Sequence, residues 1–466
     1  MLSRTFRRAR STFIGKAAKV NEPPTSSPSP PRQVSQTIPP EILLDIFGRL
    51  RPSGHLPAYE EWYVDNIINV NPSRKVIPRH LYNVCLVCRA WYQSGIVILY
   101  SRVALTSPRR FSSFRRTMQS RPDLIHYVRE LSLCDAADHL APIEIVRSHR
   151  SKQVAGMRSN ALSIIATCSN LSTLTIYLRK QAGKNSIAPL FRAQLQTVLK
   201  YRPITRFTII GEGPCPAPLT TFFDSGLKDL VLRRTVIEAG ELDPKRLPEL
   251  QTLALISVRS TRRAEMTREL LVKFKQLRTF VIVDSVTLMY PFGNPIQPAC
   301  LPNLQKLTLI STDSDLQVPF AVALTVLKQW ITPQTIPNVR DLTIGLLGSD
   351  TPLAPWFIFP PKLESLTLII APSYSGHGYG QVALDSAPQW DILRCLEHNR
   401  DHFERGTFKT LILLLCVHAS EEGIIIFPHR MIRTFCEQYG VDVMQGQIKS
   451  VLRWVEKEGI EPLSLQ

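Results

Sequence analysis

The sequence has no long apolar run, no disulfide framework and no recognisable catalytic motif. The longest apolar stretches among its 466 residues have the length of a strand, well short of the roughly 18 residues that a membrane span needs. Its nine cysteines are scattered and odd in number, which fits a reducing compartment better than an oxidising one. With 44% apolar and 20% charged residues, the composition is ordinary for a soluble globular protein with a sizeable core. We therefore expect no membrane partner.

Residue patterns that carry catalysis or bind metals are also missing. His398 and His402 have the i, i+4 spacing of zinc ligands, but the adjacent glutamate of HExxH and a third ligand are lacking. Cys85-x-x-Cys88 has no second pair, so we expect a buried structural pair there. The glycine-rich segment 373–381 matches neither a dinucleotide fingerprint nor a P-loop. We predict a non-catalytic protein with no metal site and no cofactor.

Positive charge is in excess, with a formal net charge of +18. A third of the excess lies in residues 1–36, where seven Lys/Arg stand against Glu22 alone. We expect a disordered basic tail with a Pro/Ser linker there, and the alternatives are a mitochondrial transit peptide over 1–20 or a weak nuclear-import-like cluster at 7–10. The remaining charge is spread thinly, as on a solvated surface, so a nucleic-acid partner is the weaker interpretation.

Two apolar runs, at 38–50 and 86–100, predict a pair of helices. The first begins with two prolines, which suit a helix start because their backbone nitrogens need no hydrogen-bond partner there. Ile42, Ile46 and Leu50 then recur at i, i+4 and i+8, and Leu43 and Phe47 form a second stripe beside them. A helix that is apolar over so wide an arc lies in a core or meets a partner.

The same two runs resemble the F-box, a helical module that docks onto the Skp adaptor of cullin–RING ubiquitin ligases. The matching strings are IPPEI, IF and a leucine in the first run and LVCRAW and LY in the second, and the resemblance covers about a seventh of the chain. One departure is the segment 51–78, which looks like an insertion between the two helices. The resemblance implies that the adaptor is contacted by Pro39, Ile42, Ile46, Phe47, Leu50, Val87, Cys88 and Trp91.

A basic amphipathic helix is predicted over residues 107–122. Phe111, Phe114 and Met118 have helical spacing, while five arginines and no acid occupy the other positions. We expect an apolar inner face and a basic outer face; a phosphate-binding patch is the alternative.

From residue 128 onwards, one pattern of apolar-x-x-apolar-x-apolar recurs. The strings begin at Val128, Leu171, Ile204, Leu227, Leu250, Leu277, Leu304, Val339, Leu363 and Phe408. From Leu171 their starts are 23 to 45 residues apart, which is the approximate period of leucine-rich repeats, in which each string is a short parallel strand. The strings resemble the irregular leucine-rich repeats often found after an F-box. We expect helices between strands at 188–200, 321–330 and 390–403.

Together these patterns predict an α/β chain in which an F-box is followed by a leucine-rich-repeat solenoid. The resemblance implies a non-catalytic substrate receptor of a Skp–cullin–F-box ubiquitin ligase, cytoplasmic or nuclear, with an unknown protein substrate held by the strands. The alternative is a repeat scaffold with a degenerate F-box, acting outside any ligase. Basic residues in two adjacent slots of the repeats predict a stripe for acidic or phosphorylated targets: Arg206, Lys228, Arg278, Lys306 and Arg340. The predicted divisions are a tail (1–36), the F-box-like module (37–100), a helical connector (101–126), the repeats (127–445) and a C-terminal helix or cap (446–466).

Overall fold

The fold is dominated by one parallel β-sheet that runs through most of the chain. The computed structural model describes residues 39–49, 83, 85–105, 108–134, 161–178, 204–216, 226–237, 242–260, 271, 273–283, 301–311, 331–346, 357–370, 387–416 and 430–448. The sheet contains thirteen strands, of which twelve pair one after another in chain order, while β7 pairs with β5 off this path. Strictly sequential parallel pairing is the topology of a solenoid, in which each repeat contacts its neighbours.

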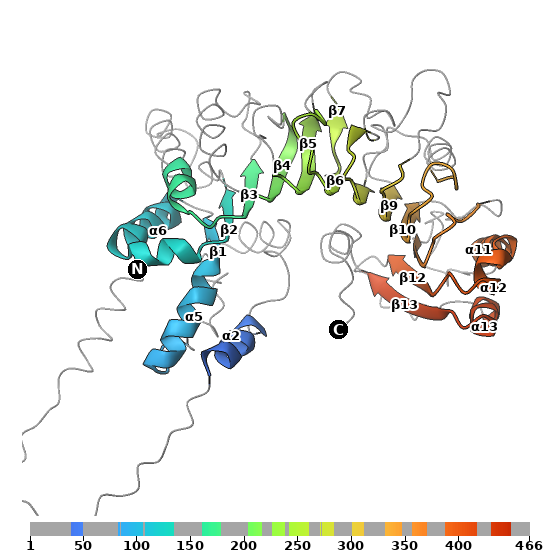
Figure 1. Ribbon diagram of the computed structural model, residues 1–466, viewed down its shortest axis with the longest axis horizontal. Helices are drawn as coiled ribbons and strands as arrows, with labels where there is room; N and C mark the ends of the chain where they lie inside the picture. Colours follow the sequence, from blue (N-terminus) through green and yellow to red (C-terminus); the bar gives the residue numbers. More distant parts are fainter. Residues whose placement is uncertain are drawn as a thin grey trace, which may run out of the picture.

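The strands are short and follow one another along an arc (Figure 1). Their bounds are β1 Arg102–Leu105, β2 Glu130–Cys134, β3 Thr173–Leu178, β4 Arg206–Pro216, β5 Asp229–Ile237, β6 Thr252–Ile256, β7 Arg259–Ser260, β8 Thr279–Val283, β9 Lys306–Ser311, β10 Asp341–Leu346, β11 Ser365–Ile370, β12 Thr410–Cys416 and β13 Asp442–Ile448. All ten repeated strings of the sequence form strands, which confirms the predicted α/β solenoid-like repeat arrangement.

Helices lie at the two ends of the described arc (Figure 1). At the N-terminal end are α2 (Pro40–Arg49), α5 (Arg89–Ser101), α6 (Pro108–Ser120) and the 3-10 helix η2 (Pro122–Tyr127). At the C-terminal end, α11 (Ala387–His398), α12 (Arg400–Glu404) and α13 (Arg430–Gln438) cover the outer side of the last strands. No helix in the described part of the chain has both the length and the apolar character needed to cross a bilayer.

The sheet buries apolar side chains on both faces. In β5, Leu230 and Leu232 belong to the large core cluster, which also contains side chains from α6, α11 and α13. Val231, between them, belongs to a second cluster with Ala254 and Val281 from the next strands. Successive side chains of a strand point to opposite faces, so the first cluster lies on the outer face under the helices and the second on the inner face. This burial on both faces is typical of parallel sheets.

Asparagines ahead of the strands link neighbouring repeats. The Asn170 side-chain amide donates to the His126 carbonyl oxygen at 2.8 Å, and that of Asn303 donates to the Lys275 carbonyl oxygen at 2.6 Å. Asn338 donates in the same way to Pro302. Such bonds satisfy backbone carbonyls in the turns, which have no strand partner of their own.

Two predicted boundaries change in the structure. The segment 101–126 was expected to be a helical connector, but it also contains β1, the first strand of the sheet. The last strand, β13, runs past the predicted boundary at 445 to Ile448. Neither strand carries the full repeat string, and each pairs in register with a neighbouring repeat, β2 for β1 and β12 for β13.

The helix α6 confirms the amphipathic helix predicted over 107–122. Phe111, Phe114 and Met118 are buried in the large core, whereas Arg115 and Arg116 are exposed. Several other predictions lie outside the described residues: the tail 1–36, the insertion 51–78, the glycine-rich segment and the helices at 188–200 and 321–330.

Candidate binding surfaces

The helices α2 and α5 pack against each other around a small core of their own. Leu43 and Phe47 of α2 are fully buried, and Trp91, Ile98 and Leu99 of α5 pack around them. The Phe47 and Trp91 rings meet edge to face with centroids 5.4 Å apart, which is a favoured aromatic geometry. The second apolar stripe of α2 thus forms the contact with α5.

The first apolar stripe of α2 remains open to solvent. Ile42 is 50% exposed and Ile46 is 42% exposed, one helical turn apart. Leu86 and Val87, in the turn that leads into α5, are 53% and 61% exposed. Four large apolar side chains of one helix pair therefore face solvent, an arrangement that marks interaction surfaces.

The residues predicted to contact the adaptor fall into three groups. Pro39, Ile42, Ile46, Val87 and Cys88 are exposed. Phe47 is only 1% exposed and packs against Trp91, where it holds the helix pair together. Trp91 is half-buried against Phe47, and Leu50 lies outside the described residues. Leu86, the first residue of the LVCRAW string, is also exposed, although it was not among the predicted adaptor contacts.

The helix α5 connects this pair directly to the sheet. One side of α5 packs on α2, while Ile96 and Tyr100 pack on the large core of the repeats. Tyr100 also stacks on Phe114 of α6, with centroids 6.4 Å apart. β1 follows α5 without an intervening loop, so the orientation of the helix pair is tied to the sheet.

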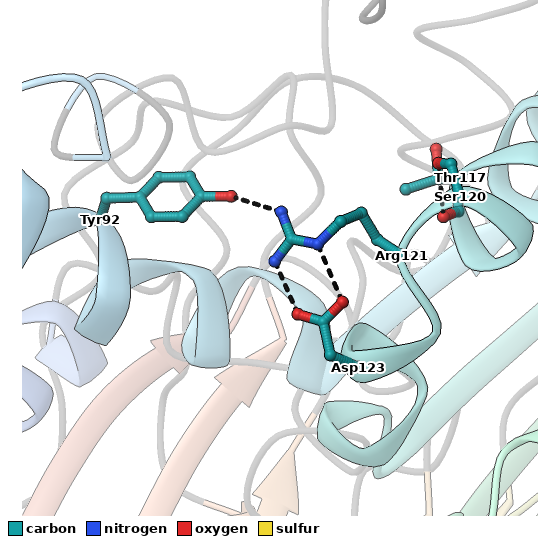
Figure 2. Close-up of polar contacts among 5 residues, drawn as sticks. All are labelled: Tyr92, Thr117, Ser120, Arg121 and Asp123. Atoms are coloured by element: carbon teal, nitrogen blue, oxygen red, sulfur yellow. Dashed lines mark hydrogen bonds and ion pairs between the residues drawn. The ribbon is translucent and has the colours of Figure 1, made fainter.

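A polar contact adds a second link between α5 and the start of the repeats (Figure 2). Arg121 donates to the Tyr92 hydroxyl oxygen at 3.2 Å and makes two hydrogen bonds to the Asp123 carboxylate, at 2.8 and 2.6 Å. The bond from Arg121 holds the pKa of Asp123 below its usual value. Because the guanidinium is planar and held at three points, it fixes Tyr92 relative to η2.

The five basic residues predicted to meet a target lie in two adjacent rows. We call the residues that immediately precede the strands the pre-strand row: Arg129, Ser172, Thr205, Lys228, Gln251, Arg278, Gln305, Arg340, Glu364 and Lys409. The residues that open the strands are the first-residue row, which contains Arg206 and Lys306. Lys228, Arg278 and Arg340 belong to the pre-strand row, so the five do not form a single stripe.

The cations of the first-residue row are matched by acids on neighbouring strands. Arg206 pairs with Asp229 at 3.2 Å, and Arg102 pairs with Glu130 at 2.5 Å. Lys306 lies in register with Asp341. Burial raises the pKa of Asp341, and Lys306 acts in the opposite direction. This row is close to neutral and is less suited to attracting an anionic partner.

The described residues of the second cluster, at the centre of the inner face, are apolar and buried. Ala254, Val281, Val283, Ile310 and Ile369 are apolar and fully buried there. Gly345 lies among them, and a Cβ at this position would come within 3.2 Å of side-chain atoms of both Ile310 and Ile369. Among the described residues of the strands, the polar rows at their N-terminal ends are more exposed than this centre.

The residues considered for metal or redox chemistry do not come together. Across the described residues, no group of three or more His, Cys, Asp or Glu is placed to hold a metal ion. His398 ends α11, while His402 is half-buried in α12 beside the Phe359 ring. Cys85 is buried but Cys88 is exposed, so the predicted buried pair is wrong for Cys88. No protein-family profile and no curated protein sequence matches this chain.

Proposed function

We propose that this chain is the substrate-recognition subunit of a Skp–cullin–F-box ubiquitin ligase. The observation that carries the proposal is the set of exposed apolar residues, Ile42, Ile46, Leu86 and Val87, on a helix pair whose sequence resembles the F-box. Apolar side chains on a small helix pair lose exposed surface when a partner covers them, which favours association. The Skp adaptor is the partner that the resemblance implies.

The proposed activity is positioning, with no bond-making residue on the chain. The helix pair anchors to the adaptor, and the repeats hold a protein target at a fixed orientation set by α5 and the contact of Arg121 with Tyr92. Target lysines are then held near the ubiquitin-conjugating enzyme that the cullin recruits. Holding two reactants in place raises their effective concentration, and this proximity supplies the rate enhancement.

Changing the exposed stripe of α2 tests the proposal. We expect the double variant Ile42→Asp/Ile46→Asp to weaken binding of the purified Skp adaptor by at least about 100-fold, because it places two charges where apolar burial is required. The matched control is Ile358→Asp/Met431→Asp, which changes two side chains of similar exposure, 50% and 40%, ahead of β11 and on α13. Calorimetry with the adaptor measures both affinities, and circular dichroism checks the fold.

The outcomes separate the ligase from a scaffold function. Adaptor binding by the wild type and the control, but not by the α2 variant, supports the ligase function. Equal binding by all three would contradict the assignment of the surface. No binding by the wild type would favour a repeat scaffold that acts outside any ligase.

A further inference from the structure

We propose that the pre-strand row between β5 and β10 binds an extended acidic segment of a partner protein, with one anionic side chain at every third residue. If the chain is a ligase receptor, this segment belongs to the target, and in that respect the inference rests on the proposed function. The binding itself requires only the repeats.

The side chains of this part of the row alternate between cation and amide. In sheet order they are Lys228, Gln251, Arg278, Gln305 and Arg340. Four of them are exposed and Gln251 is half-exposed. Their backbone amides are already bonded, each to the carbonyl of the preceding row member at 2.7 or 2.8 Å from Gln251 to Arg340. The side chains are therefore the groups left to contact a ligand.

The charge of the row is not neutralised over most of this length. Within the described residues, Lys228 and Arg278 form no ion pair, whereas Arg340 shares Glu364 with Lys409 at 3.3 and 2.7 Å. The turn before β8 adds Lys273 and Lys275, both exposed. The first-residue row beside it places Asp229 against Arg206. An anionic ligand thus meets unpaired cations at the centre of the row, around Arg278.

The spacing of the cations fits an extended polypeptide. Neighbouring parallel strands lie about 4.8 Å apart, so cations on every second strand are separated by about 9.6 Å along the sheet. An extended chain in the polyproline II conformation has three residues per turn, so every third side chain lies on the same side, and its rise of about 3.1 Å per residue makes three residues span about 9.3 Å. Acidic residues at every third position would therefore meet Lys228, Arg278 and Arg340 in turn. Acidic residues spaced more closely would not align with all three cations.

The residues between the cations favour a peptide over a nucleic acid. Gln251 and Gln305 each carry an amide that both donates and accepts, as a peptide backbone requires. Single-stranded nucleic acids are bound by basic grooves with aromatic side chains on which the bases stack. The pre-strand row contains no aromatic residue from Arg129 to Lys409. The chemistry points to carboxylate or phosphate groups displayed on a protein segment.

Fluorescence anisotropy with the full chain tests the proposal. The probe is a labelled ten-residue peptide with glutamate at positions 2, 5 and 8 and small neutral residues elsewhere; phosphoserine replaces glutamate in a second peptide. We expect both to bind at least about tenfold more tightly than the same peptide with glutamine. A peptide with the three glutamates adjacent should bind about threefold more weakly than the peptide with glutamate at positions 2, 5 and 8. Binding should weaken about tenfold between low and 0.5 M salt, because salt screens exposed charges.

Two double variants with the same change in charge locate the site. Lys228→Gln/Arg278→Gln should lose about tenfold in affinity, whereas Arg115→Gln/Arg116→Gln on the exposed face of α6 should lose less than twofold. Equal losses in both variants, or equal affinity for the glutamate and glutamine peptides, would overturn the proposal. Tighter binding of an eight-nucleotide single-stranded RNA than of the peptides would also overturn it. Ile42→Asp/Ile46→Asp should bind the peptide normally, so failure of the adaptor proposal and failure of this one are distinguishable.

Discussion

The helices at the two ends of the described chain differ in how fully they bury their apolar side chains. At the C-terminal end, α11, α12 and α13 close over the last strands with an aromatic cluster of Phe357, Phe359, Phe403, Phe408, Phe435 and Tyr439. At the N-terminal end, α2 and α5 share a core in which, among the described residues, two side chains are fully buried, Leu43 and Phe47. Four large apolar side chains are exposed on and beside this helix pair. Among the described residues of α11–α13, Met431 is the only large apolar side chain that is exposed.

This difference separates a closed cap from a helix pair that leaves apolar side chains exposed. The C-terminal helices cover the end of the large core, as the terminal units of a solenoid must. Gly406 and Gly440, with φ of 64° and 67°, let α12 and α13 turn directly into the next strands. The helix pair covers little of the core and leaves Ile42 and Ile46 in water. The proposed adaptor would cover this surface, whereas the cap is already packed against the sheet.

The largest expected effect concerns the small core of the helix pair. Phe47→Ala should destabilise the contact of α2 with α5 by about 3–5 kcal/mol, since a fully buried aromatic ring is removed and few other contacts remain. Ile46→Ala should change stability by less than about 1 kcal/mol, because nearly half of that side chain is already exposed. Native-state hydrogen exchange of the α2 and α5 amides measures both.

The two variants should also separate stability from binding. Ile46→Ala should weaken adaptor binding while α2 keeps its protection, and exchange in β5 to β12 should be unchanged in both variants. Loss of protection throughout the sheet in Phe47→Ala would show that the helix pair is part of the repeat core, and the contrast between the two ends would then be wrong.

The next effect concerns a buried asparagine at the C-terminal end. The Asn399 amide donates to the carbonyl oxygens of Phe357 at 2.7 Å and Cys395 at 2.8 Å, and its oxygen accepts from the Phe359 amide at 2.7 Å. Asn399→Leu keeps the number of side-chain heavy atoms but leaves the Phe359 amide without its partner and the Phe357 carbonyl with only the Cys395 thiol at 3.7 Å, while the Cys395 carbonyl still accepts from the Asn399 backbone amide. We expect a loss of about 3 kcal/mol in the free energy of unfolding, measured in urea.

The matched control is Asn303→Leu, which removes an exposed bond to the Lys275 carbonyl. Water can replace that bond, so the expected loss is under about 1 kcal/mol. Equal losses in the two variants would mean that the C-terminal end is no more tightly closed than the exposed turns between repeats.

The sequence predicted the sheet well because its pattern reports burial directly. Strings such as LQKLTL place apolar residues where one face of a strand meets the core, and each such string became a strand. β1 (RVAL) and β13 (DVMQGQI) carry only part of the pattern. Their pairing depends on neighbouring repeats in space, which no local pattern shows.

The sites were harder to predict because they depend on which face is covered. Motif position placed Phe47 on the adaptor surface, but Trp91 lies against that face of α2 and buries it. The predicted helix over 390–403 is divided at Asn399, whose side chain is held by Phe357 and Phe359 from another repeat. Likewise, the sequence places Lys228 and Arg206 in adjacent slots, but only the structure shows that the Arg206 slot is matched by acids such as Asp229. In each case a tertiary contact decides the outcome.

The smallest expected effect is a dependence of the C-terminal end on pH. Burial against Phe359, followed by the charge of Arg405, lowers the pKa of His402 below its usual value, while Asp401 acts in the opposite direction. Below about pH 6.5 the unfolded chain therefore takes up a proton before the folded chain does, and the free energy of unfolding falls as the pH drops from there towards the lowered pKa.

The variant His402→Gln should not show this contribution to the decrease in the free energy of unfolding. The variant His398→Gln, on the exposed end of α11, should still show it. Urea midpoints at pH 5 and 7.5 measure the difference. Hydrogen exchange at the two pH values, corrected for intrinsic rates, should place the weakening in α11 to α13 and leave α2 unchanged; an equal change at both ends would break the contrast between the closed cap and the open helix pair.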